Sequence, residues 1–214
     1  MKMKKFIPIL MAFFLSLTGC GKKDLIVHEP ASEAMLDFYL ECLEAEENGE
    51  TVEIVVDGVN RFNTLGYINV SGMSIADEAK EARMTMEEYR ETYDIPENMP
   101  DDTFMEVAYN FQSVEKIATS YEMTYEDLKE MYSFPEYIER KSGEKIPVTK
   151  DLPWGVVCDE LTIEGLQMNL DALRKAYGFG EEVTEKTKWK EIRPDVEKKQ
   201  QEKANQNKVE KEEE

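Results

Sequence analysis

Apolar and polar positions follow one another with helical spacing through the middle of the chain. In each of two segments, apolar residues stand at positions i, i+3 and i+7. They are Met86, Tyr89 and Tyr93 in the first segment, and Tyr125, Leu128 and Tyr132 in the second. Residues with this spacing lie on one face of an α-helix. The pattern therefore predicts two short amphipathic helices.

Helix-starting signals precede both segments. Thr85 followed by Glu88 matches a capping box, and Thr124 followed by Asp127 comes close to one. In a capping box the hydroxyl and the acidic side chain bond each other's backbone N–H groups, which satisfies two donors at the start of a helix. We therefore expect a helix to begin immediately after each threonine.

Each of these helices is followed by a proline that ends it and is preceded by the start of another short helix. Pro96 and Pro135 follow the two segments and cannot continue a helix, because proline has no backbone N–H. Ser74 and Ser113 stand farther upstream, where N-caps of additional short helices are expected. The pattern predicts a compact helix–turn–helix in each segment.

The two segments are copies of a repeat. Residues 84–97 and 123–136 are identical at seven of fourteen positions, at an offset of 39 residues, and 168–180 is a weaker third copy. A short apolar patch, expected to dock against a neighbouring repeat, follows each copy, at 103–107, 152–156 and 187–192. Such a period indicates tandem units that bury their faces against their neighbours. We therefore predict a mainly α-helical chain, with repeat 1 at 72–110, repeat 2 at 111–160 and repeat 3 at 161–194.

Equivalent apolar and proline positions of the copies are the predicted repeat core. They are Tyr89, Tyr93, Pro96, Leu128, Tyr132, Pro135, Leu173 and Tyr177. Trp154 and Trp189 also stand at equivalent positions, which favours a place between repeats over a role in binding a ligand.

A small α/β piece, 31–71, precedes the repeats. Residues 31–48 have the pattern of an amphipathic helix, with Met35, Phe38, Cys42 and Ala45 on one side. Alternating apolar residues then lead to the turn Asp57-Gly58, and a second apolar run covers 65–70. This pattern predicts a short β-hairpin.

The first residues have the pattern of an export signal. Three lysines precede the apolar run 6–17, which is too short to span a bilayer and ends at Leu17-Thr18-Gly19-Cys20. The residues Leu17-Thr18-Gly19-Cys20 resemble the lipobox of bacterial lipoproteins. The resemblance implies a signal peptide at 1–19, lipid attachment to Cys20, a tether at 20–30, and a protein anchored on the extracytoplasmic face of a cell membrane. The alternative is an ordinary cleaved signal, or a lone anchor helix with a chance cysteine.

Charge is distributed unevenly along the chain. Residues 24–185 carry 12 basic and 38 acidic side chains, a net charge of −26. So acidic a surface repels nucleic-acid phosphates, which excludes nucleic acid as a partner. Residues 195–214 are almost without apolar side chains, and we expect a disordered or frayed helical tail there.

Catalytic and metal-binding patterns are sparse. The single histidine, His28, lies in the predicted tether, which argues against histidine-based nucleophilic and zinc or haem sites. Cys42 and Cys158 remain after export, and burial as free thiols is favoured over a disulfide. Carboxylate pairs are too numerous to single out one pair. We therefore predict no metal, no cofactor and no catalytic residue, with a carboxylate-based envelope hydrolase as a lesser alternative.

The repeats resemble two kinds of module. Residues 113–118 and 124–128 resemble part of a LysM wall-binding module, although its opening Gly-Asp-Thr and terminal asparagine are missing. Residues 72–194 resemble short repeats appended to bacterial membrane proteins, including cytochrome-b-like and iron–sulfur proteins. The second resemblance implies an accessory of a membrane redox complex. The leading expectation is a non-catalytic interaction or accessory protein that docks an unknown envelope or membrane protein through acidic helical repeats.

Overall fold

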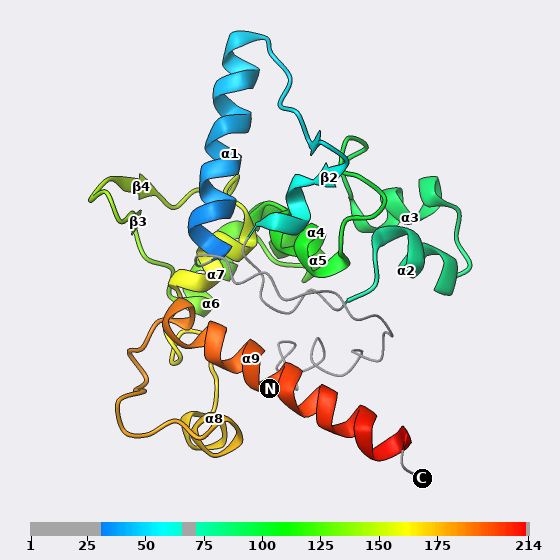
Figure 1. Cartoon of the computed structure of the whole chain (residues 1–214). Coiled ribbons are helices and arrows are strands. Elements are labelled where there is room, and N and C mark those ends of the chain that lie inside the picture. The colour runs from blue at the N-terminus through cyan, green and yellow to red at the C-terminus, as the bar shows by residue number, and fades with distance from the viewer. Residues whose placement is uncertain (1–30, 66–71, 213–214) are drawn as a thin grey trace, which may run out of the picture.

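The structure is a computed structural model that describes residues 31–65 and 72–212. This part of the chain is mainly helical, as predicted, and has two small antiparallel hairpins (Figure 1). The helices are α1 (Ala31–Asn48), the short 3-10 helix η2 (Arg61–Thr64), α2 (Ile75–Glu81), α3 (Met86–Tyr93), α4 (Met105–Phe111), α5 (Val114–Ser120), α6 (Tyr125–Tyr132), α7 (Trp154–Glu160), α8 (Leu170–Tyr177) and α9 (Trp189–Glu212). The strands are β1 (Val55–Val56), β2 (Val59–Asn60), β3 (Tyr137–Glu139) and β4 (Lys145–Pro147).

The predicted repeats fold as three units that close in the same way. An isolated antiparallel bridge joins the start of each unit to the start of its last helix. The three bridges are Ser74–Phe104, Ser113–Pro153 and Thr162–Lys188. Unit 1 contains α2, α3 and α4, unit 2 contains α5, α6 and α7, and unit 3 contains a turn, α8 and the start of α9. The apolar patches after the repeats are therefore the beginnings of a third helix, α4, α7 or α9.

The predicted N-caps are confirmed. Thr85 and Glu88 form a complete capping box, in which the Glu88 carboxylate accepts the Thr85 N–H at 2.8 Å. Thr124 and Asp127 form another at the start of α6. These bonds join atoms three residues apart, so the local sequence is sufficient to place them.

Each second helix ends in the same reversal. The residue after the helix has left-handed backbone geometry, and these residues are Asp94, Ser133 and Gly178. The next N–H bonds the carbonyl five residues back, as in Ile95 to Arg90 at 2.9 Å and Phe134 to Lys129 at 3.1 Å. This arrangement is a Schellman motif, which turns the residue after the left-handed position toward the helix.

The Schellman motif corrects part of the predicted core. Ile95 and Phe134 are buried, whereas Pro96 is exposed and Pro135 is only partly buried. The prolines were predicted as core residues, but the reversal turns the preceding apolar residue inward and leaves the proline outside.

The helix face itself is only partly as predicted. Tyr89, Leu128 and Leu173 are buried. Tyr132 and Tyr177 are partly buried, and Tyr93 is 46% exposed, so its assignment to the core is wrong. Tyr93 is the last residue of α3, where covering a side chain depends on an element outside the helix.

Helix α7 is the centre of the molecule. All its residues are buried, and it packs against α1, α4, α5 and α9. Trp154 and Trp189 are buried at the first positions of α7 and α9, as their equivalence predicts. Cys158 is buried in α7, Cys42 is partly buried in α1, and both are free thiols.

Unit 2 carries an insertion. The connection between the second and third helices runs from Pro96 to Asp101 in unit 1, but from Pro135 to Lys150 in unit 2. The extra residues form the hairpin β3–β4, which projects from the body beside α1 (Figure 1). Insertions in repeat proteins often form a binding face.

The N-terminal piece has the predicted helix and turn, but its second strand is β2 (Val59–Asn60), earlier in the chain than the predicted run 65–70. Helix α1 covers 31–48, and the turn Asp57-Gly58 joins β1 to β2 with positive φ at both residues. Asn60 then donates hydrogen bonds to Asp102 and Thr103 at 2.8 Å each, which attaches this piece to unit 1. Most of the second predicted strand, 65–70, lies outside the described residues.

The C-terminal segment is helical. Helix α9 continues to Glu212, and its residues Val196 and Glu197 are buried, so of the two predicted forms, disordered or frayed helical, the structure has the helical one. The reason is tertiary, because α9 packs against α7 and α8. A segment with few apolar residues is thus held by contacts that its composition does not indicate.

Replacing Gly165 by Ala is expected to destabilise the contact between units 2 and 3. A Cβ at this position would lie 2.7 Å from the Tyr132 carbonyl oxygen, so the backbone must shift. We expect a loss of about 1–3 kcal/mol in the free energy of unfolding, measured by urea denaturation. Gly72→Ala is the control, because nothing lies within 4 Å of its Cβ. Equal stability of the two variants would contradict the prediction.

Candidate functional site

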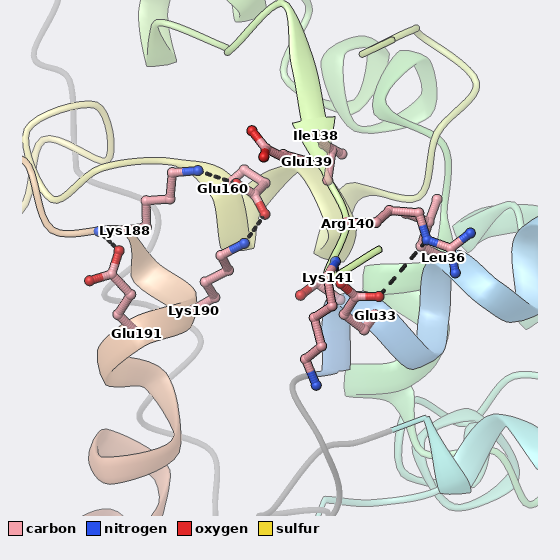
Figure 2. Close-up of a pocket in the computed structure, with 11 residues that line it drawn as sticks. Glu33, Leu36, Ile138, Glu139, Arg140, Lys141, Glu160, Lys188, Lys190 and Glu191 are labelled. Atoms are coloured by element: carbon pink, nitrogen blue, oxygen red, sulfur yellow. Dashed lines mark hydrogen bonds and ion pairs between the residues drawn. The ribbon is translucent and has the colours of Figure 1, made fainter. Parts of the chain in front are cut away.

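A groove of about 560 Å³ lies where the inserted hairpin meets the core. It is bordered by the first turns of α1, the end of β3, the end of α7 and the start of α9 (Figure 2). Leu36 and Ile138 contribute apolar surface. Its basic residues are Arg140, Lys141, Lys188 and Lys190, and its acidic residues are Glu33, Glu139, Glu160 and Glu191.

One wall of the groove has two ammonium groups on one carboxylate. The Glu160 side chain is 2% exposed and accepts hydrogen bonds from Lys188 Nζ, at 2.6 Å, and from Lys190 Nζ (Figure 2). Lys188 belongs to the bridge that closes unit 3, so the repeat geometry places it opposite the end of α7. A buried carboxylate is stabilised by such paired cations.

The other wall has one guanidinium among three carboxylates. Arg140 Nη1 lies 3.1 Å from Glu144, Arg140 Nε lies 4.0 Å from Glu33, and Arg140 Nη2 contacts Asp37. The Lys141 N–H donates to Glu33 at 3.1 Å. These contacts fix the hairpin to α1.

A buried cluster of charges lies behind the groove. Arg193 of α9 is 3.0 Å from the Asp159 carboxylate and 3.6 Å from that of Glu197, and Asp159 is 1% exposed. Burial raises the pKa of Asp159, whereas Arg193 and hydrogen bonds with Ser32 lower it. The cluster thus ties α7 and α9 to the first turn of α1.

Glu106 of α4 adds a further carboxyl to this cluster. Burial, followed by the negative charge of Glu197, raises the pKa of Glu106 to about 8, and Arg193 acts in the opposite direction. Glu106 is therefore mostly protonated at neutral pH. The bound proton neutralises the Glu106 carboxyl and so reduces the net negative charge around Arg193.

The sequence-predicted lipid site lies outside the described residues. This applies to Leu17, Thr18, Gly19 and Cys20, and also to His28. The predicted repeat-core residues do not line the groove. None of its residues was singled out from the sequence. Two features of the sequence could have indicated them. One is the acidic pair Asp159-Glu160 at the end of an apolar run, and the other is the pair of lysines on either side of Trp189.

Within residues 31–65 and 72–212, no group of histidine, cysteine, aspartate and glutamate side chains is arranged to hold a metal ion. None of the helices in this part of the chain has the length and apolar character needed to cross a membrane.

The three resemblances noted in the sequence, to bacterial lipoproteins, to part of a LysM module and to repeats of membrane-associated proteins, stay predictions. Comparison with protein-family models, with curated proteins and with solved structures found no match to this chain.

Proposed function

We propose that this protein is a lipoprotein, anchored through Cys20 on the extracytoplasmic face of a cell membrane, that acts as a non-catalytic interaction or accessory protein. Its partner is an envelope or membrane protein. The observation that carries this proposal is the hairpin inserted into unit 2, because it turns a regular repeat into one with a charged groove beside α1.

The place of the groove supports a partner close to the membrane. Helix α1 begins at Ala31, eleven residues after Cys20. A fully extended chain spans at most about 3.6 Å per residue, so the first turn of α1 lies within about 40 Å of the lipidated residue. Because Ser32 and Glu33 of this turn line the groove, the groove stays within reach of membrane-bound partners.

The charges of the groove support recognition of a polar protein segment. Two ammonium groups meet one carboxylate on one wall, and on the other the Arg140 guanidinium meets Glu33, while Asp37 and Glu144 contact it from outside the lining. A partner protein with an acidic and a basic side chain at matching positions can form ion pairs with both walls, in place of the ion pairs within the chain. Such complementary charges favour specificity and orientation over affinity.

Replacing Cys20 by Ala is expected to abolish fatty-acid labelling of the protein in cells, because the thiol is the acyl-carrying group in the lipobox chemistry. The measurement is metabolic labelling with a clickable fatty acid, followed by mass analysis of the N-terminus. Cys42→Ala is the matched control and is expected to keep the label. Labelling that persists in Cys20→Ala would contradict the anchor.

The interaction itself is tested by crosslinking in intact cells, followed by mild detergent extraction and mass spectrometry. The proposal expects one membrane complex, recovered in near-stoichiometric amount with the wild-type protein and depleted with Cys20→Ala. Recovery of the same background proteins from both strains would count against an accessory role.

A further inference from the structure

The second helix of every unit ends in a tyrosine, and two of the three rings are covered. The tyrosines are Tyr93, Tyr132 and Tyr177, each directly before the left-handed residue of its Schellman motif. The Tyr132 ring packs edge-on against Trp154, with ring centres 5.9 Å apart. Tyr177 is covered by helix α9, and the contacts there are chemically specific.

Helix α9 presents cations and an amide to the end of α8. Gln200 Nε2 donates to the Tyr177 hydroxyl at 3.0 Å. Lys203 Nζ lies 5.3 Å from the centre of the Tyr177 ring and donates to the Ala176 carbonyl at 3.0 Å. Lys199, one turn earlier, donates to the Tyr177 carbonyl and lies 5.1 Å from the centre of the Phe179 ring. Residues at i and i+4 share one helix face, so this chain already contains a basic helix docked on a repeat end.

The equivalent ring of unit 1 is open. Tyr93 is 46% exposed, and the described ring that contacts it is Tyr89 of the same helix, with centres 4.5 Å apart. Figure 1 shows α2 and α3 at one edge of the molecule, on the side opposite the hairpin β3–β4. The surface here is strongly acidic, because residues 74–102 carry ten acidic and three basic side chains.

Some groups at the end of α3 are already engaged within the chain. Gln112 Nε2 donates to the Tyr93 carbonyl at 2.6 Å, and Lys116 pairs with Asp94 at 3.1 Å. What remains for a partner is the open face of the Tyr93 ring, together with exposed carboxylates of the same unit such as Glu91 and Glu97.

We propose that the end of α3, centred on Tyr93, is the docking surface for a basic helical segment of a partner protein that presents lysine or arginine at positions i and i+4. One cation lies over the Tyr93 ring, as Lys203 lies over Tyr177, and the other pairs with the acidic residues of α3. This surface is separate from the groove beside the hairpin, so the inference, which rests on the proposed function, adds a second contact with the partner and states its chemistry.

The test uses the full-length lipoprotein in detergent and two synthetic helical peptides of about 20 residues, long enough to be helical in isolation. One peptide carries lysine pairs at i and i+4, and the other carries glutamate at the same positions. Binding is measured by fluorescence anisotropy at low and at physiological salt. We expect the lysine peptide to bind, to weaken as salt rises, and to bind Tyr93→Ala about tenfold more weakly.

The control variant is Tyr137→Ala, because Tyr137 is exposed on the hairpin, far from unit 1 in sequence. We expect it to bind the lysine peptide like the wild type, and circular dichroism melts check that both variants are folded. Equal binding of the two peptides, or equal binding by Tyr93→Ala and the wild type, would overturn the proposal. A dimer that sedimentation detects and Tyr93→Ala dissolves would also overturn it, because a second copy would then occupy this surface. Fatty-acid labelling does not depend on Tyr93, and recovery of a membrane complex by the wild-type protein tests the proposed function without reference to this surface, so the proposed function can hold where this inference fails.

Discussion

Replacing Arg193 by Met is expected to lower the free energy of unfolding by about 3–5 kcal/mol, the largest effect of any single substitution considered for this chain. Arg193 lies between the buried carboxylates of Asp159 and Glu197. Removing the guanidinium leaves like charges close together in a region with little water. Urea denaturation at pH 7 measures the change.

Two further variants show whether charge causes this loss. Asp159→Asn combined with Arg193→Met is expected to lose less than the two single changes together, because the double variant no longer buries an unpaired charge at Asp159. Lys150→Met is the exposed control, since Lys150 pairs with Glu115 at 2.8 Å on the surface and such pairs contribute about 0–1 kcal/mol. Strictly additive losses would mean that Arg193 stabilises the fold by packing alone.

Replacing Glu106 by Gln is expected to remove a fall in stability between about pH 4.5 and pH 8. Because the pKa of Glu106 is raised from 4.5 to about 8 in the folded protein, the folded state keeps a proton between these values that the unfolded state releases. Stability therefore decreases as pH rises from about 4.5 through 8, and this contribution is fully lost above 8. Glutamine cannot titrate, so the variant is expected to be more stable than the wild type at pH 9 by about 2 kcal/mol. Part of Glu106 is exposed, which keeps this figure below what the full shift would give.

The measurement is a series of urea denaturation curves from pH 4 to pH 9. Glu88→Gln is the control with the opposite sign, because hydrogen bonds from Thr85 lower the pKa of Glu88. Stability that depends on Glu88 is present above the pKa of an ordinary glutamate and is lost as pH falls below it. Glu88→Gln is expected to change how the free energy of unfolding depends on pH below the pKa of an ordinary glutamate, and to leave its decrease toward pH 8 unchanged. The Glu106 prediction fails when Glu106→Gln keeps the wild-type slope between pH 6 and pH 9.

Features that depend on near neighbours in sequence were predictable. The helix starts at Thr85 and Thr124 and the turn at Asp57-Gly58 follow from groups within four residues of one another. The three-unit repeat was predictable for the same reason, since each copy carries its own set of local signals. The extent of α1 could be read from its apolar spacing.

Features that depend on what covers a side chain were not predictable. Tyr93 and Tyr177 occupy equivalent positions, yet α9 covers Tyr177, while Tyr93 stays nearly half exposed. Likewise, the apolar patch at 103–107 is the start of α4, which closes unit 1, because the bridge from Ser74 to Phe104 places it there. Spacing defines a face, but the neighbour that covers the face comes from elsewhere in the chain.

The difference between what the sequence determines and what only the tertiary structure determines is clearest at the candidate site. The repeat and the helix caps depend on short stretches of sequence, and each could be predicted from its own stretch. The groove instead brings Glu33 to Arg140 and Glu160 to Lys188. These pairs form because α7 packs at the centre of the molecule and the inserted hairpin folds back onto α1. Pairing across such distances depends on the closure of long chain segments, which costs entropy and is offset by burial of the whole core.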